Sequence, residues 1–180
     1  RQSWPLPVGA GRNMAIVLVA IGSNRCHGRH GRPHGVVRAA IAALPDVRAA
    51  SPIITTAPLG PGTRHYANAV VALDWGGTLA DLLALLQGME RAFGRRRGRR
   101  WGNRVLDLDI VAAGAAVVRA RRLMVPHPEL ARRRFVLDPL VAVAPGWRHP
   151  VLGLTARQLR ARALRPKGPA SPSSFWDKGP

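Results

Sequence analysis

Apolar runs and their breaks divide the first part of the chain into a strand, a loop and a helix. Residues 15–21 (AIVLVAI) are short and continuously apolar and end in Gly22-Ser23-Asn24, a pattern typical of a buried strand that runs into a turn. Residues 25–35 are rich in Gly, His and Arg without periodicity, so we expect a loop. An Ala-rich helix is predicted over 36–44, where Pro45 stops it.

Two strands are predicted next. Residues 47–56 are rich in β-branched side chains and lead into a Pro/Gly loop at 57–62. Residues 66–73 alternate well enough for a second strand, which Gly76-Gly77 ends. Strands joined in this way are expected to pair antiparallel.

The second half of the chain holds the clearest helix. Over residues 78–93, apolar side chains recur at helical spacing, with Thr78 and Asp81 placed as caps, and Gly94 ends the pattern. Residues 105–112 are predicted as a strand, 115–118 as a short partner, and 155–163 as a last helix with Thr155 and Gln158 as a capping box.

The predicted order of elements is strand, helix, strand, strand, helix, strand. Long βαβ repetition with a Gly-rich fingerprint is absent from the sequence, which favours an α+β fold with a mostly antiparallel sheet over a doubly wound one. We expect one domain over 14–165. Residues 1–13 form an N-terminal extension expected to be disordered or non-native, with Met14 as the natural start, and the Pro/Ser-rich residues 166–180 form a tail expected to be disordered.

Composition changes the picture in two ways. An apolar fraction of 47% without a membrane-length run or a signal peptide predicts a soluble protein, and one cysteine, Cys26, suits the cytoplasm. The net charge of +19, from 28 Lys and Arg against nine acids, predicts an affinity for polyanions. Nucleic acid and a nucleotide triphosphate both qualify, and part of the Arg excess can equally reflect a GC-rich coding sequence. The oligomeric state stays open, and a monomer is compatible with the sequence.

Asp107 and Asp109 stand two apart in the predicted strand 105–112, so their side chains should project from one face. Two adjacent carboxylates repel each other unless a cation lies between them. Magnesium fits, because one or two carboxylates plus substrate phosphates commonly hold it. The plainer alternative is a half-exposed strand whose polar face carries two acids.

The Gly-punctuated segment 94–104 contains six Arg directly upstream of this pair. Guanidinium groups bind phosphate oxygens in pairs, and a cationic loop beside a metal site is typical of phosphoryl transfer. A solvated surface loop is the alternative.

Further candidates are weaker when they are taken singly. His127 lies between Pro126 and Pro128, which stiffens its backbone, but a lone His is more often structural. Tyr66 and Phe135 could stack on a flat ring, and Asn68 carries the donor and acceptor that match the edge of a pterin or purine. Each of the three could equally serve the core, a turn or a strand ladder.

Taken together, these motifs resemble those of the 6-hydroxymethyl-7,8-dihydropterin pyrophosphokinase family over residues 14–150. The resemblance rests on IGSN at 21–24, TAPLG at 56–60, RWGNRVLDLDI at 100–110 and VPHP at 125–128, with Tyr66, Asn68, Arg133 and Phe135 at matching positions. It implies a ferredoxin-like sandwich and transfer of the diphosphate of ATP to the pterin alcohol, with release of AMP, in folate biosynthesis. ATP and the dihydropterin would be the partners, without a membrane or a required nucleic acid.

The resemblance also implies roles for individual residues. Asp107 and Asp109 would hold two magnesium ions, and Arg95 and Arg104 would be the catalytic arginines on the phosphates. The ATP-binding residues would be Gln87, Arg97, Trp101, Arg122, His127 and Arg133. The pterin-binding residues would be Thr56, Leu59, Tyr66, Asn68, Glu90 and Phe135.

The sequence departs from the family at three places. Asn103 stands where Pro is usual, Arg134 stands where a small residue is common, and residues 25–35 differ from the usual first loop. Two other readings therefore remain beside the enzyme. One is a basic nucleic-acid-binding module, although the chain shows no helix-turn-helix, RNP-like or zinc pattern, and the other is a family member that has lost its activity.

Overall fold

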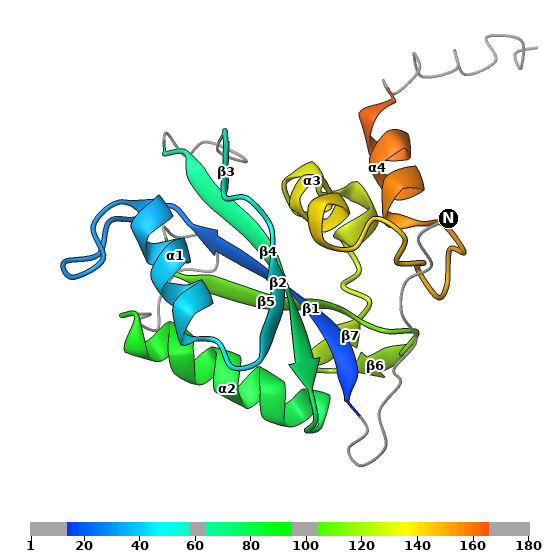
Figure 1. The fold of residues 1–180 in the computed structure, drawn as a ribbon, viewed down its shortest axis with the longest axis horizontal. Coiled ribbons are helices and arrows are strands. Elements are labelled where there is room, and N and C mark those ends of the chain that lie inside the picture. Colours follow the sequence, from blue (N-terminus) through cyan, green and yellow to red (C-terminus); the bar gives the residue numbers. More distant parts are fainter. Residues whose placement is uncertain (1–13, 58–63, 95–103, 166–180) are drawn as a thin grey trace, which may run out of the picture.

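The computed structural model describes residues 14–57, 64–94 and 104–165 (Figure 1). The predicted N-terminal extension and C-terminal tail lie outside these residues, as do Leu59, Arg95, Arg97 and Trp101 from the predicted site.

An antiparallel sheet in the order β2-β4-β1-β5 forms the centre of the fold. The strand β1 (Ala15–Ser23) pairs with β4 (Tyr66–Trp75) on one side and with β5 (Asp107–Ala113) on the other. The strands β2 (Val47–Ala50) and β3 (Ile54–Thr56) pair with successive parts of β4. With α1 and α2 as the connections, this order confirms the predicted α+β, ferredoxin-like architecture and the antiparallel pairing of 47–56 with 66–73.

Helices cover both faces of the sheet (Figure 1). The helices α1 (Pro33–Ala43) and α2 (Leu79–Ala92) pack on one face, where the core includes Val19, Leu82 and Leu86. On the opposite face, α3 (Arg134–Val143) packs against Leu18 and neighbouring side chains of the sheet, and α4 (Ala156–Leu164) packs against α3. β4 is buried from both sides, which explains its nearly continuous run of apolar residues.

The two capping boxes predicted from the sequence are confirmed. The hydroxyl of Thr78 accepts a hydrogen bond from the backbone N–H of Asp81, the carboxylate of Asp81 accepts one from the backbone N–H of Thr78, and α2 starts there. Thr155 and Gln158 form the same pair at the start of α4. Gly94 follows α2 with φ +86°, a left-handed conformation that suits glycine at a helix end.

Several predicted boundaries were wrong by a few residues. The first helix begins at Pro33 rather than at residue 36, because proline at the first helical position has no N–H to satisfy there. The strand predicted over 47–56 is two strands, interrupted at Ser51 and Pro52, where Ser51 hydrogen-bonds to Val70 and Pro52 has no N–H to donate. β5 begins at Asp107 rather than at residue 105.

Two elements beyond β5 differ from the prediction. The short partner expected at 115–118 is wrong. The strand β6 (Val118–Ala120) pairs instead with β7 (Leu123–Val125), because the chain turns at Gly114, which has φ +50°. The 3₁₀ helix η1 (Leu130–Arg132) and α3 were not predicted at all.

Among the described residues, no helix combines the length and the apolar character that crossing a bilayer would require.

Candidate active site

Asp107 and Asp109 project from one face of β5, as predicted. Both are half-buried, whereas Leu108 and Ile110 between and after them are buried against the core under α1 and α2. The two carboxylates therefore lie on the opposite face, the one that α3 covers. A strand places alternate side chains on one face, so their spacing brings the two acids together.

Gly22 of β1 lies between the carboxylate pair and the predicted pterin residues. It pairs with Asp107 of β5 on one side and with Asn68 of β4 on the other. Directly paired residues of an antiparallel sheet point to the same face, so Asn68 and Asp107 share a face two strands apart, with roughly 10 Å between their backbones. A Cβ atom on Gly22 would lie 3.3 Å from Oδ1 of Asn68. Because Gly22 has no side chain, the surface of the sheet between Asn68 and Asp107 is left open to a ligand.

Arg104 connects the site to the segment that precedes β5. Its Nη1 donates a hydrogen bond to Oδ1 of Asp107, and the two side chains form an ion pair. Burial alone would lower the pKa of Arg104, but the charge and hydrogen bond of Asp107, helped by Glu90, raise the pKa above its ordinary value. The guanidinium therefore stays charged beside the carboxylates.

The backbone of Arg104 is itself fixed by Asn24, which follows β1. The backbone N–H of Arg104 donates to Oδ1 of Asn24 at 2.9 Å, and the backbone N–H of Asn24 donates to the carbonyl of Arg104 at 3.2 Å. Asn24 is only 5% exposed. A buried side chain thus positions the residue that contacts Asp107.

Asp109 is half-buried beside Asp107. Burial and the neighbouring charge of Asp107 raise the pKa of Asp109, while His127, Arg133 and Arg104 act in the opposite direction. Two neighbouring carboxylates in a partly buried position are stabilised when one of them binds a proton or when both bind a cation. The arrangement therefore fits a divalent ion, which would replace the proton.

His127 lies beside Asp109 at the outer edge of β5. Its backbone N–H donates to the carbonyl of Val111 at 2.9 Å, and its Nδ1 accepts a hydrogen bond from the N–H of Glu129 at 3.1 Å. Burial lowers the pKa of His127, and Asp109 partly opposes that shift. An acceptor at Nδ1 places the proton of the neutral ring on Nε2, so Nε2 is the donor available to a ligand.

The predicted pterin residues Thr56, Tyr66 and Asn68 lie together where β3 meets β4. Thr56 pairs with Tyr66, and Nδ2 of Asn68 donates to Oγ1 of Thr56 at 2.8 Å. Tyr66 and Asn68 are two apart in β4, so they face the same side as Asp107. Asn68 is buried and held by Thr56, which gives its amide a fixed orientation.

Phe135 and Arg133 approach this face from the start of α3. The guanidinium carbon of Arg133 lies 5.8 Å from the centre of the Phe135 ring. Phe135 is half-buried and packs against the core beneath α3. It therefore serves as a core residue, which was the alternative to ring stacking in the sequence analysis.

Three other predicted residues lie on different elements. Glu90 of α2 is 3% exposed, and its Oε1 accepts a hydrogen bond from the backbone N–H of Leu108 at 2.9 Å. Gln87, also on α2, is exposed, and Arg122 is exposed in the turn between β6 and β7.

The described side chains could hold magnesium only with help from a substrate. Among them, no group of three or more His, Cys, Asp or Glu side chains is arranged to bind a metal. Two carboxylates suffice for magnesium when phosphate oxygens and water complete the shell. The site therefore fits an ion that arrives with a nucleotide.

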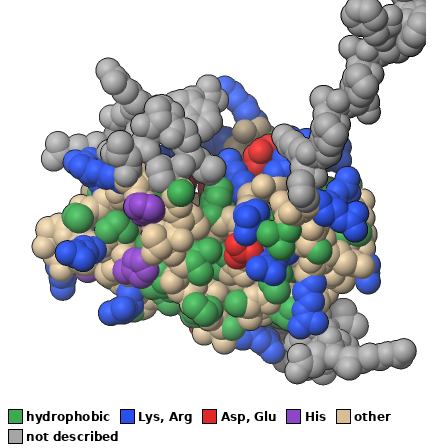
Figure 2. All heavy atoms as spheres, turned by 90° about the horizontal axis from the view of Figure 1, so that it is seen from above, with side chains coloured by type: hydrophobic (Ala, Val, Ile, Leu, Met, Phe, Trp, Pro, Cys, Tyr) green, Lys and Arg blue, Asp and Glu red, His purple; other side chains and the backbone are tan. Residues whose placement is uncertain are grey.

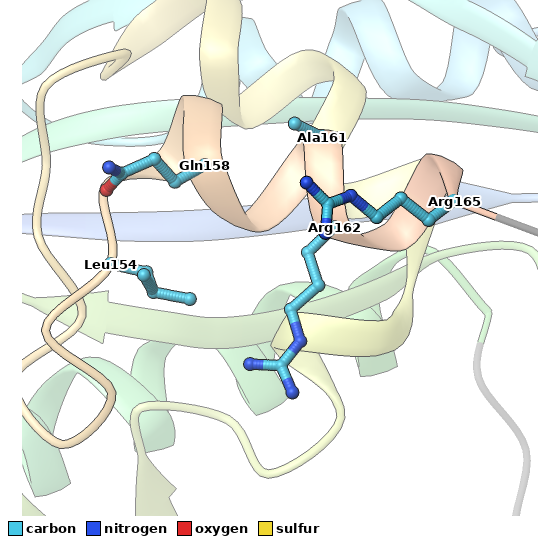
Figure 3. Close-up of a pocket in the computed structure, with 5 residues that line it drawn as sticks. All are labelled: Leu154, Gln158, Ala161, Arg162 and Arg165. Carbon is cyan, nitrogen blue, oxygen red and sulfur yellow. The ribbon is translucent and has the colours of Figure 1, made fainter.

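Positive charge surrounds the site and extends beyond it. On the face in Figure 2, Lys and Arg side chains far outnumber acidic ones. A separate hollow of about 470 Å³ lies against α4, where Arg162 and Arg165 extend along it (Figure 3). It is lined by Leu154, Gln158, Ala161, Arg162 and Arg165, and none of the predicted site residues takes part in it.

Comparisons with known proteins identify the relatives of this chain. Residues 18–145 match the family model described as 7,8-dihydro-6-hydroxymethylpterin-pyrophosphokinase (HPPK). The chain is 42% identical over 140 residues to 2-amino-4-hydroxy-6-hydroxymethyldihydropteridine pyrophosphokinase of Pseudomonas aeruginosa, covering 74% of this chain and 83% of that protein. The protein of the same name from Methylorubrum extorquens is 40% identical over 131 residues, covering 71% of this chain and 81% of that protein.

A solved structure supports the fold. The crystal structure of Plasmodium falciparum HPPK-DHPS superimposes with a TM-score of 0.67 at 11% identity, covering 86% of this chain and 45% of that one. This chain therefore spans less than half of that two-part protein. The family match and the identities above show that the chain belongs to the 7,8-dihydro-6-hydroxymethylpterin-pyrophosphokinase family.

Proposed function

We propose that this chain transfers the terminal diphosphate of ATP to the hydroxymethyl group of 6-hydroxymethyl-7,8-dihydropterin, a step of folate biosynthesis. The observation that carries the proposal is the arrangement across three strands. Asn68, Gly22 and Asp107 lie in one row on one face of the sheet, so a group that binds a ring edge stands beside a group that binds a metal. The enzyme names of the relatives support this chemistry.

Asp107 and Asp109 would hold two magnesium ions together with the phosphate oxygens of ATP. The ions would supply neutralisation of the phosphate charge and alignment of the reacting phosphate. Support comes from the position of both carboxylates on one face and from the raised pKa of Asp109, which burial and the neighbouring charge of Asp107 cause.

Arg104, Arg133 and His127 would bind the triphosphate. In the structure Arg104 neutralises Asp107. When the substrate brings its own cations to the carboxylates, that guanidinium can turn to the phosphate oxygens without leaving a carboxylate unpaired. Gln87, Arg122, Arg97, Trp101 and Arg95 remain proposed nucleotide contacts on the basis of the family resemblance.

Thr56, Asn68, Tyr66 and Phe135 would form the pterin site, with Leu59 contributing from outside the described residues. Asn68 is held by Thr56 and so presents its amide in one orientation. Tyr66 lies on the same face two residues away, and Phe135 comes from α3, which covers that face. Flat rings stack well on such side chains.

The reaction needs no covalent intermediate with the protein. The pterin hydroxyl oxygen forms a bond to the β-phosphorus of ATP, the bond between that phosphorus and the bridging oxygen of the α-phosphate breaks, and AMP leaves with that oxygen. The hydroxyl proton is lost to solvent. Rate enhancement would then come from positioning and from charge stabilisation by the arginines. We further propose that the chain works in the cytoplasm as a monomer.

The test is an assay of AMP formation. Purified protein should release AMP from ATP only when the hydroxymethyl-dihydropterin and magnesium are both present. Asp107→Ala and Asp109→Ala should each abolish the reaction, while circular dichroism shows the fold intact. The control Asp74→Ala removes an acid that pairs with Arg48 at the far end of β4 and should keep full activity. Activity near the wild-type rate in either site variant rejects the metal assignment.

A basic nucleic-acid-binding protein is the second candidate, favoured by the net charge of +19. Binding through phosphate contacts weakens steeply as salt rises. A salt-sensitive shift of DNA or RNA without AMP formation would favour it over the enzyme. A chain that binds ATP with magnesium and releases no AMP would instead identify a family member without activity.

A further inference from the structure

Glu90 is a buried carboxylate at the free edge of β5. It belongs to α2, is 3% exposed, and its Oε1 accepts a hydrogen bond from the backbone N–H of Leu108 at 2.9 Å. Burial of a carboxylate is costly unless hydrogen bonds compensate it. The cost of burying Glu90 in the apolar stripe of α2 is therefore offset at least in part by this hydrogen bond, which points to a specific role for the carboxylate.

The hydrogen bond from Leu108 to Glu90 takes the place of a bond that a further strand would make at the outer edge of β5. β5 ends the order β2-β4-β1-β5, so half of its backbone groups point away from β1. Two of these outward groups have identified partners: Glu90 takes the N–H of Leu108, and the N–H of His127 reaches the carbonyl of Val111. At these two positions, individual residues rather than a neighbouring strand bind the outward backbone groups of β5.

The point that Glu90 holds lies between the two acids of the site. The peptide group that carries the N–H of Leu108 joins Asp107 to Leu108, and Asp109 is the next residue. A peptide group is planar, so its orientation sets the direction of the backbone on both sides. Holding this one group restricts the backbone next to Asp107 directly and, through Leu108, the backbone next to Asp109, in addition to the pairing of both residues with β1.

We propose that Glu90 is a positioning residue that acts through Leu108 to aim Asp107 and Asp109 at their magnesium ions. The proposal rests on the function proposed above and replaces the expectation that Glu90 contacts the pterin.

The test compares two replacements of similar size. Glu90→Gln keeps an oxygen for the N–H of Leu108, whereas Glu90→Met fills the space without a comparable acceptor. Magnesium affinity is measured by calorimetry in the presence of the non-reacting analogue α,β-methylene-ATP, and turnover by AMP release. Groups that orient metal ligands typically contribute about 10- to 100-fold in metal affinity or activity. We expect a loss of this order for Glu90→Met and recovery of most of it for Glu90→Gln.

The control is Leu82→Ala, which removes a buried side chain from the same face of α2, eight residues before Glu90, and leaves the hydrogen bond to Leu108 in place. It should lower the melting temperature and leave magnesium affinity unchanged. Equal magnesium losses in Leu82→Ala and Glu90→Met would overturn the proposal, since general loosening of α2 would then explain both. A Glu90→Gln variant as weak as Glu90→Met would also overturn it, because the charge rather than the position would matter.

Pterin affinity distinguishes a positioning role of Glu90 from direct contact between Glu90 and the pterin. A positioning role predicts unchanged pterin affinity in Glu90→Gln and Glu90→Met, whereas direct contact predicts a loss. If Glu90→Met fails to fold, Glu90→Ala takes its place: a magnesium loss confined to Glu90→Ala supports the proposal, and equal magnesium affinity in Glu90→Ala and Glu90→Gln overturns it. Calorimetry needs no turnover, so the result stands apart from the assay of the proposed function.

Discussion

The side-chain oxygen of Asn24 accepts a hydrogen bond from the backbone N–H of Arg104, a residue 80 positions later in the chain. A second bond, from the N–H of Asn24 to the carbonyl of Arg104, runs in parallel. The end of β1 is therefore locked to the residue whose guanidinium contacts Asp107. We regard Asn24 as part of the framework that holds this arginine in place.

Removing the Asn24 side chain should lower turnover more than stability alone explains. Asn24→Ala leaves the half-buried N–H of Arg104 without its side-chain acceptor and so removes a hydrogen bond that contributes about 0.5–1.5 kcal/mol. We expect kcat to fall at least tenfold in the AMP assay. Ser51→Ala is the matched control, because Oγ of Ser51 also accepts a backbone N–H, that of Val70 on β4, two strands away from Asp107. Equal kcat values in the two variants, at similar melting temperatures, would contradict the prediction.

The Asn24 contact also shows what the sequence could and could not reveal. The segment Ile21 to Asn24 stands out as a strand end, and the alternation at Asp107 and Asp109 follows from a period of two. Local patterns of this kind correctly predicted the sheet, the capping boxes and the shared face of the acids. The partner of Asn24 is set by tertiary packing across 80 residues, and no local pattern encodes it.

The helix α3 was missed for a different reason. Its first residue, Arg134, continues a run of three Arg, and Pro139 lies inside it. Proline inside a helix removes a hydrogen bond and normally marks a boundary. Packing of Val136, Leu137 and Leu140 against the sheet outweighs that cost here. Glu90 lies among the apolar positions of α2, which is visible in the sequence. Its hydrogen bond to Leu108 of β5 is not, because that contact depends on how the helix packs on the sheet.

Gly22→Ala should weaken pterin binding. The added methyl group would lie 3.3 Å from Oδ1 of Asn68, whose amide is held on its other side by Thr56. Overpacking of this kind typically costs about 1–3 kcal/mol, and if that cost falls on the bound state it corresponds to about 5- to 150-fold in affinity. Gly28→Ala is the control, since nothing lies within 4 Å of the position that its Cβ would take. Pterin titrations that show wild-type affinity for Gly22→Ala would place the ring elsewhere.

Tyr66→Ala should affect pterin binding more than ATP binding. Stacking on an aromatic ring contributes about 0.5–1.5 kcal/mol beyond the buried area, so we expect roughly a tenfold loss of pterin affinity. Tyr66→Phe keeps the ring and should bind almost normally. Calorimetry with each ligand separately measures the difference. Equal losses for ATP and pterin in Tyr66→Ala would argue against stacking.

His149 should make the stability of the protein depend on pH below neutrality. It is 8% exposed, stands next to Arg148, packs 5.7 Å from the ring of Trp147, and its Nδ1 accepts hydrogen bonds from the N–H groups of Val151 and Leu152. Burial lowers its pKa in the folded state. The unfolded chain, with an ordinary histidine pKa of about 6.5, therefore binds a proton at a higher pH than the folded protein does.

The stabilisation from neutral His149 is thus present above about pH 6.5 and is lost as the pH falls through the lower pKa of the folded state. His149→Asn retains a side-chain acceptor for the same two N–H groups but cannot titrate. Urea unfolding at about pH 7.5 and about pH 5.5, on either side of the histidine range, should show the wild type losing more stability than His149→Asn. Because the other five histidines are common to both proteins, the difference isolates His149, and parallel losses would show that its pKa is ordinary.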